Sequence, residues 1–207
     1  MKRPYPGLPP LVAALTTFLD NIGRVSIVDA TLDDIRAARA KVYPTAPPFS
    51  WITGRVPSGV TIDESSAPAR DGASIPLRWY TPAGRREDRP LLVYLHGGGW
   101  VQGSTRMYDP LCTHLAAELD AVVVSVDYRM APEHRAPAAI NDCLDVTAWA
   151  LGPDSGLRID PERVALTGDS AGGNLAAAVA QSVRASPAPR RSGSGRPPRP
   201  AQATPSA

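Results

Sequence analysis

The sequence has few of the residues that disulfide frameworks and metal sites need. Its 207 residues include two cysteines and three histidines. Cys112 and Cys143 lie in stretches of helical periodicity without metal-ligand spacing, so we expect two buried free thiols. This scarcity argues against a disulfide scaffold or a zinc domain, and we expect no metal and no other cofactor.

Long apolar runs are also missing. The longest near the start, Leu11 to Leu19, follows Met1-Lys2-Arg3 and is too short to span a bilayer. It imitates a signal peptide, but prolines precede it, Asp20 and Asn21 end it, and no small-residue cleavage pattern follows at once. We therefore expect no membrane span and a cytoplasmic location.

The chain has no strong charge of either sign, since its formal net charge is +2. Residues 184–207 hold five arginines, six prolines, no acid and no large apolar side chain, which leaves the rest slightly acidic. The composition of residues 184–207 predicts a disordered tail. The slightly acidic charge of the body gives no reason to expect a nucleic-acid partner. So abrupt a change is typical of a shifted reading frame or a truncated gene.

The pattern in front of that tail predicts a mostly parallel, doubly wound α/β sheet. An antiparallel hairpin comes first, from two strands joined by a turn at Arg70 to Ala73. Continuous apolar runs, typical of strands covered on both faces, then alternate with helical patterns. The expected strands are Val60 to Ile62, Ile75 to Tyr80, Leu91 to Leu95, Ala121 to Val126 and Val164 to Thr167, and the expected helices are Asp109 to Leu119 and Ala138 to Leu151.

Residues 1–50 form a separate helical region in this interpretation, residues 51–183 the α/β core and residues 184–207 the tail. Two helical patterns occupy the first region, Leu11 to Ile22 and Thr31 to Val42, the second capped by Thr31. From the residues alone, we interpret this region as a helical appendage packed on the body. Trp51 either lines a pocket or belongs to the core.

The last apolar run breaks into Gly-Asp-Ser-Ala-Gly-Gly at residues 168–173, and a helical pattern with Leu175 and Val179 on one face follows. Strand, sharp turn and helix in that order strain the serine backbone, and small neighbours such as Gly168 and Gly172 make room for it. The Ser170 hydroxyl then projects above the sheet, and the N–H of Ala171 faces a carbonyl oxygen under attack. The pattern indicates an acyl-transfer nucleophile.

A second motif, His-Gly-Gly-Gly-Trp at residues 96–100, closes the apolar run Leu91 to Leu95. Consecutive glycines leave backbone amides unshielded, which is what an oxyanion site built from backbone donors needs. The spacing does not fit a glycine-rich nucleotide loop.

Together the two motifs resemble the hormone-sensitive-lipase-like branch of the α/β-hydrolases, the bacterial family IV esterases. The segment Asp127 to His134 also resembles that family, and the resemblance covers roughly residues 57–183. It implies hydrolysis of small carboxylic esters by Ser170, with oxyanion donors Gly97, Gly98 and Ala171. The motif residues implied to support them are His96, Gly99, Trp100, Gly168, Asp169, Gly172 and Gly173. The resemblance also implies that residues 1–50 lie over the active site as a cap, and this alternative to an appendage stays open.

The family mechanism also needs an acid and a histidine that follow the serine, and this chain has no Asp, Glu or His after Ser170. His96, His114 and His134 are poor substitutes by position, so we expect low or absent activity. Two alternatives stay open: a non-catalytic module that binds a small ligand, and a fragment completed by a partner polypeptide. The strand at Val164 would then be an exposed sheet edge, through which we expect poor solubility or self-association.

Overall fold

The structure is a computed structural model that describes residues 7, 9, 10, 12, 13, 29–42, 50, 56–84, 88–152, 155 and 159–185. Trp51, nearly all of the predicted tail and all but residues 12 and 13 of the predicted helix Leu11 to Ile22 lie outside the described residues. The expected boundaries of the three regions therefore stay predictions.

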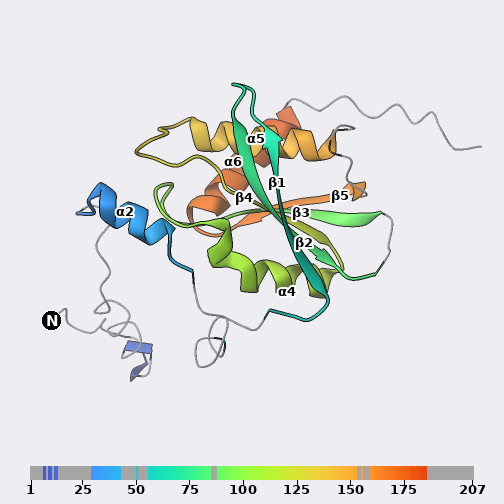
Figure 1. Cartoon of the computed structure of the whole chain (residues 1–207), viewed down its shortest axis with the longest axis horizontal. Helices are drawn as coiled ribbons and strands as arrows, with labels where there is room; N and C mark the ends of the chain where they lie inside the picture. Colours follow the sequence, from blue (N-terminus) through green and yellow to red (C-terminus); the bar gives the residue numbers. More distant parts are fainter. Residues whose placement is uncertain are drawn as a thin grey trace, which may run out of the picture.

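The described elements follow the expected order, a hairpin and then alternating strands and helices (Figure 1). They are α2 Leu32–Arg39, β1 Val60–Pro68, β2 Ser74–Pro82, β3 Arg89–Leu95, the 3-10 helix η1 Thr105–Tyr108, α4 Asp109–Leu119, β4 Val122–Val126, α5 Ala138–Leu151, β5 Ile159–Gly168 and α6 Ala171–Ala185. The bounds predicted for α4 and α5 are confirmed. The predicted cap of α2 is also confirmed, because Thr31 and Asp34 form a reciprocal capping box.

Strand β5 begins at Ile159, five residues before the apolar run that predicted it. The added residues include Pro161 and Glu162, both exposed. A proline and charged side chains are tolerated in a strand at the edge of a sheet, where the backbone need not pair on both sides. The apolar pattern marks only the covered half of such a strand.

The sheet has the order β1-β2-β4-β3-β5. β1 pairs antiparallel with β2 and β2 with β4, whereas β3 runs parallel to both β4 and β5, which confirms the expected fold class. Figure 1 shows α5 and α6 on one face and α4 on the other. Alternate β3 residues serve the two faces: Leu91, Val93 and Leu95 pack in the α5 and α6 core, and Leu92 and Tyr94 in the α4 core. Both predicted free thiols, Cys112 and Cys143, are buried.

The register decides which residues meet at the carboxyl ends of the strands. Leu95, the last residue of β3, pairs with Val126 of β4 on one side and with Gly168 of β5 on the other. The three strands therefore end side by side, although their ends are up to 73 residues apart in sequence. The loop after Leu95 and the turn after Gly168 are neighbours for this reason.

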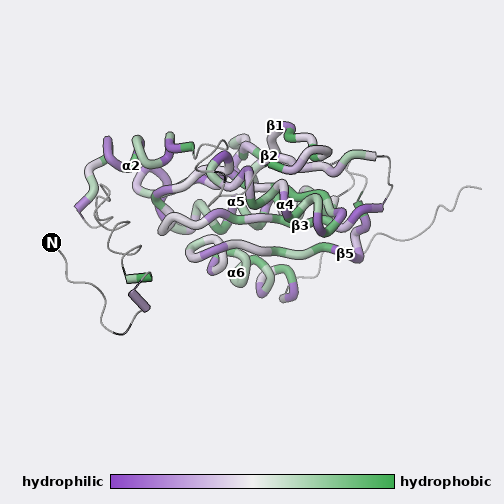
Figure 2. Tube along the Cα trace, turned by 90° about the horizontal axis from the view of Figure 1, so that it is seen from below, coloured by the Kyte–Doolittle hydropathy of each residue, from purple (hydrophilic) through white to green (hydrophobic). Residues whose placement is uncertain are grey.

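Strand β5 is the last strand of the described sheet and pairs there only with β3. Figure 2 shows it beside α6 at one edge of the molecule. Val164 and Leu166 are half-buried against the α5 and α6 core, and Ala165 is exposed. The expected open edge is present in the described part of the chain, whereas self-association through it stays a prediction.

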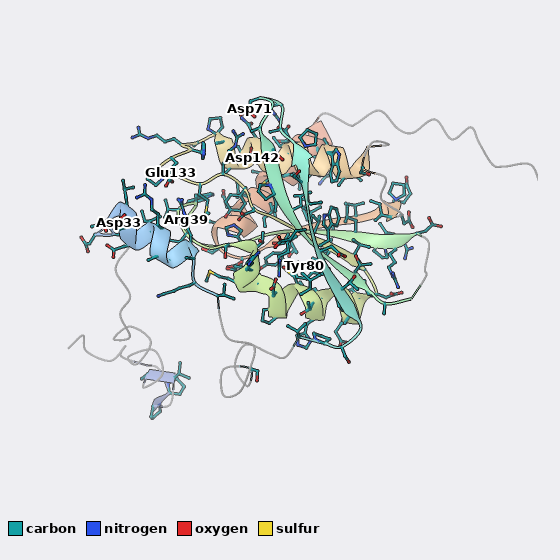
Figure 3. The ribbon with its side chains drawn as sticks, viewed as in Figure 1. Asp33, Arg39, Asp71, Tyr80, Glu133 and Asp142 are labelled. Carbon is teal, nitrogen blue, oxygen red and sulfur yellow. The ribbon has the colours of Figure 1, made fainter. Side chains whose placement is uncertain are left out.

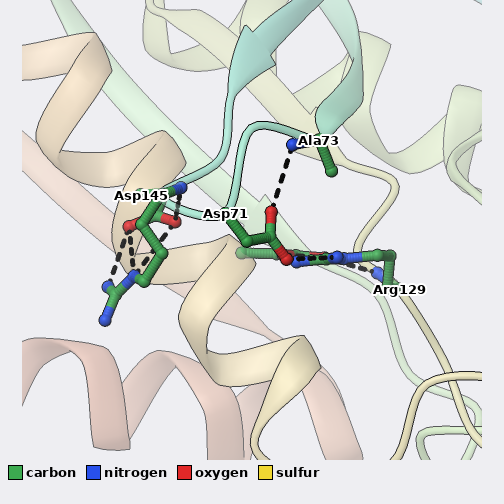
Figure 4. Close-up of polar contacts among 6 residues, drawn as sticks. Asp71, Ala73, Arg129 and Asp145 are labelled. Carbon is green, nitrogen blue, oxygen red and sulfur yellow. Dashed lines mark hydrogen bonds and ion pairs between the residues drawn. The ribbon is translucent and has the colours of Figure 1, made fainter.

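Arg129 ties the hairpin to α5 by bonding the carboxylates of Asp71 and Asp142, both of which Figure 3 labels. Its side chain bonds the Asp142 carboxylate through Nε at 3.0 and 3.1 Å and through Nη2 at 2.6 Å, and its backbone N–H donates to the same carboxylate at 2.8 Å. Nη1 donates to Asp71 in the hairpin turn at 2.7 Å, and this bond lowers the pKa of Asp71 (Figure 4). Asp142 is fully buried, so its charge depends on these bonds.

Replacing Asp142 by Ala is expected to lower the free energy of unfolding by about 3 kcal/mol, because Arg129 loses its main acceptor and the backbone N–H loses its partner. Asp145→Ala is the matched control on the same helix. It removes an ion pair with Arg70, whose side chain is 53% exposed, and a bond from the exposed Arg70 backbone N–H, and it should cost about 1 kcal/mol. Urea unfolding measures both; equal losses would contradict the ranking.

Candidate active site

Ser170 lies at the turn between β5 and α6 with a φ of 50°, a left-handed conformation that only glycine adopts readily. Its neighbours explain how the chain can turn there. A Cβ on Gly172 would lie closer than 3.0 Å to backbone atoms of Leu95 and His96, and one on Gly168 equally close to Leu95 and Gly172. The turn is thus packed against the end of β3, where no side chain fits.

The first turn of α6 begins directly after Ser170, and three of its amides are bonded to carbonyls at the turn. Gly172 and Gly173 N–H donate to the Asp169 carbonyl at 2.8 and 3.2 Å, and Asn174 N–H donates to the Ser170 carbonyl at 3.1 Å. The Ala171 N–H makes no hydrogen bond to another described residue. Because a helix N-terminus carries a partial positive charge, this amide is suited to a developing negative charge.

The buried His96 side chain supports the backbone of the three-glycine loop, residues 97–99. Its ring is stacked on Tyr128 with centroids 4.4 Å apart, and Nδ1 lies 2.9 Å from the Gly97 carbonyl oxygen. A carbonyl can only accept, so we assign the proton to Nδ1. Burial lowers the pKa of His96, which keeps the imidazole neutral. Tyr128 O–H donates to the His96 carbonyl at 2.6 Å and holds the same stretch of backbone.

The Asp169 carboxylate joins the loop to the serine turn. It accepts the Gly97 N–H at 2.9 Å and the Tyr94 hydroxyl at 2.9 Å on Oδ1, and the Tyr108 hydroxyl at 3.0 Å on Oδ2. Burial, and then the bond to Asp169, raises the pKa of Tyr94, which therefore remains a donor. Asp169, the residue before Ser170, thus sets the distance between the two motifs.

The Gly97 N–H is already engaged, because it donates to the Asp169 carboxylate at 2.9 Å and to the Tyr108 hydroxyl at 3.2 Å. The N–H groups of Gly98 and Gly99 make no hydrogen bond to another described residue. Gly97, Gly98 and Ala171 stay predicted oxyanion donors. No sequence pattern points to Tyr94 or Tyr108 as site residues, and Asp169 is recognisable in the sequence only as part of a motif.

The Ser170 side chain is exposed, and its hydroxyl has no hydrogen-bond partner among the described residues. All three histidines lie in the described part of the chain, and none of them is hydrogen-bonded to the Ser170 hydroxyl. His96 is fully buried under the loop, His114 belongs to α4, and His134 lies in the loop before α5. The poor fit of these histidines as bases agrees with their positions.

An apolar pocket of about 380 Å³ opens beside the first turn of α6. Its wall includes Trp100, Leu175 and Ile140, and the Trp100 side chain is 43% exposed. The remaining lining residues are Ala131, His134, Ala136, Pro137, Ala139 and Asn174. The pocket has the size and lining of a site for a small apolar group.

Neither a metal site nor a membrane span emerges from the described residues. They contain no group of three or more His, Cys, Asp or Glu side chains arranged to hold a metal ion. None of the described helices combines the length and the apolar character that crossing a bilayer requires.

The fold and the strand–turn–helix site define an α/β hydrolase. The chain belongs to the α/β hydrolase fold family, whose model matches residues 92–202, and within it to the hormone-sensitive-lipase-like branch.

Among curated relatives, carboxylesterase NlhH of Mycobacterium tuberculosis is 35% identical over 184 residues, which are 89% of this chain and 55% of the relative. Ethyl acetate hydrolase of Pseudomonas putida is 40% identical over 65% of this chain and 43% of its own length. An esterase structure from Pyrobaculum calidifontis matches with a TM-score of 0.71 and 35% identity over 86% of this chain and 54% of that one. The chain therefore spans about half the length of the relatives that it matches.

Replacing Ser170 by Gly is expected to raise the free energy of unfolding by about 1 kcal/mol, because glycine relieves the left-handed strain. Ser170→Ala removes the hydroxyl and keeps Cβ, so it should change stability by less than about 0.5 kcal/mol. Urea unfolding of the two variants separates strain from the loss of the hydroxyl. A glycine variant no more stable than the alanine variant would show that the turn is unstrained.

Proposed function

We propose that this chain carries the nucleophile and the oxyanion site of a carboxylic ester hydrolase. The observation that carries the proposal is the left-handed Ser170, held beside the three-glycine loop by the Asp169 carboxylate. The esterase activities of the relatives support the same chemistry for this chain. The substrate class is small carboxylic esters, whose apolar part the pocket beside Trp100 suits in size.

In the proposed reaction Ser170 Oγ attacks the ester carbonyl carbon. The carbonyl oxygen becomes negative and accepts hydrogen bonds from the Ala171 N–H and the N–H groups of Gly98 and Gly99. Collapse of this intermediate breaks the ester bond, releases the alcohol and leaves the acyl group on Ser170. Attack by water then releases the carboxylic acid and restores the serine. The bond between Gly97 and Asp169 fixes the loop that supplies the donors.

The missing step is removal of the serine proton. No described histidine bonds to Ser170, and no acid or histidine follows Ser170 in the sequence. Loss of the histidine of such a triad costs on the order of a millionfold in turnover, while donors and binding keep roughly a thousandfold over water. We therefore propose low or absent turnover for the chain by itself.

The second candidate function is a binding module for a small acyl compound. The unpartnered Ser170 hydroxyl and the apolar pocket favour it, because binding needs a pocket and no base. A partner polypeptide that pairs with β5 and supplies acid and histidine is the third. The binding module and the partner-completed enzyme both use the described Ser170 site. The binding module needs nothing further, whereas the partner-completed enzyme needs an acid and a histidine from a second chain.

The test is a chimera in which the residues after Val183 are replaced by the corresponding part of the Mycobacterium tuberculosis relative. We expect it to hydrolyse 4-nitrophenyl butyrate and to bind a fluorophosphonate covalently at Ser170, as detected by mass spectrometry. The present chain should form no such adduct within the same time, because its serine is not activated.

The control is the same chimera with Ser170→Ala, which should lose both activities. A folded chimera, judged by circular dichroism, that neither hydrolyses the ester nor reacts at Ser170 would refute the esterase proposal. Saturable binding of the ester by the present chain, with no turnover by the chimera, would favour the binding module. Activity on mixing the two parts as separate chains would favour completion by a partner.

A further inference from the structure

The N-terminal helix α2 reaches the site through one side chain. Arg39 is its last residue, and Figure 3 shows it beside Glu133, whereas Asp33 lies toward the other end of the helix. The Arg39 side chain is only 22% exposed, although α2 itself has a single buried residue, Ile35. Its surroundings are therefore unlike those of the other charged side chains of this helix.

The guanidinium group of Arg39 binds two loops at once. Nε donates to the Val101 carbonyl at 2.9 Å, and Nη2 donates to the Ala131 carbonyl at 2.6 Å. Nη2 also donates to a Glu133 carboxylate oxygen at 3.0 Å, and this bond lowers the pKa of Glu133. We call these three hydrogen bonds the Arg39 clamp. A guanidinium is suited to it, because its donors form a planar fork that an ammonium group cannot imitate.

The two loops of the clamp meet at Trp100. Ala131 N–H donates to the Trp100 carbonyl at 3.0 Å, and the Val101 carbonyl, which the clamp binds, belongs to the next residue. Trp100 has a φ of 61°, an unfavourable conformation for a bulky residue, so its backbone needs outside support. The clamp holds the Val101 carbonyl and the Ala131 N–H holds the Trp100 carbonyl, so two consecutive carbonyls are fixed.

We propose that Arg39 is a positioning residue that holds Trp100 as the wall of the apolar pocket and fixes the end of the three-glycine loop. Its effect on ester binding rests on the proposed function, while its effect on the loops does not. In this proposal α2 is part of the site. The two interpretations of residues 1–50 as a whole, a cap or an appendage, both stay predictions.

The test compares variants of the full chain by hydrogen exchange with mass spectrometry. Arg39→Met keeps much of the apolar stem and removes every donor, so exchange in peptides covering residues 98–103 and 130–134 should rise at least about tenfold. Exchange in β3 should not change. Three amides report this most directly: Val101 and Gln102 N–H donate to the Gly98 carbonyl within the first loop, and Ala131 N–H donates from the second loop to the Trp100 carbonyl in the first.

Three further variants separate the clamp from ordinary stabilisation. Arg36→Met is the matched control, because Arg36 belongs to the same helix, pairs with Asp33 and is 63% exposed; it should change nothing in either loop. Glu133→Gln leaves both carbonyl bonds and should raise exchange less than twofold. Arg39→Lys should give an intermediate rise, and it provides the test if Arg39→Met does not fold.

A second readout follows Trp100 itself. The emission of Trp100 is obtained as the difference between each variant and the same variant with Trp100→Phe, and its quenching by iodide should at least double in Arg39→Met. A residue that only stabilises the fold would lower the urea midpoint and leave this quenching unchanged under native conditions. Unchanged loop exchange, a rise spread evenly over the chain, or unchanged quenching would each overturn the proposal, whatever the outcome of the esterase test.

Discussion

The site depends on a single carboxylate. Asp169 accepts the Gly97 amide and two tyrosine hydroxyls, and it is the residue next to Ser170, so the loop after β3 and the turn after β5 cannot move apart independently. The shared register of β3 with its two parallel neighbours brings the loop and the turn together, and the carboxylate then fixes their distance. An oxyanion site made of backbone donors needs this, because its donors have no side-chain freedom with which to adjust.

Close packing of the turn against the end of β3 explains the backbone strain at Ser170. Gly168 and Gly172 let the turn approach the end of β3, and Ser170 takes up the remaining bend in a conformation that costs energy. Strain of this kind persists only where surrounding bonds fix it, and here the carbonyls of Asp169 and Ser170 are held by the first turn of α6. Trp100 repeats the pattern in the loop after β3, where Ala131 N–H holds its carbonyl and Arg39 holds the carbonyl of the next residue, Val101.

The sequence was sufficient for the fold class and for helices α4 and α5, because continuous apolar runs and helical periodicity report burial directly. It could not give the start of β5, since Pro161 and Glu162 carry no apolar signal, nor the short helix η1. At the site, the glycines and Ser170 are visible as a motif, whereas Tyr94, Tyr108 and Arg39 contribute through contacts between distant segments. Gly97 shows the limit most clearly: a bare amide is recognisable in sequence, but the group that it bonds is not.

The central claim is best tested by the hydrogen exchange of the Gly97 amide, measured by nuclear magnetic resonance in the wild type and in Asp169→Ala. A hydrogen bond to a carboxylate is worth about 1.5–3 kcal/mol, so exchange at Gly97 should become about ten- to a hundredfold faster in the variant. Amides within β3 should keep their rates, and Tyr94→Phe, which leaves the Gly97 bond in place, should change Gly97 little. Equal Gly97 exchange in the wild type and in Asp169→Ala would contradict the account.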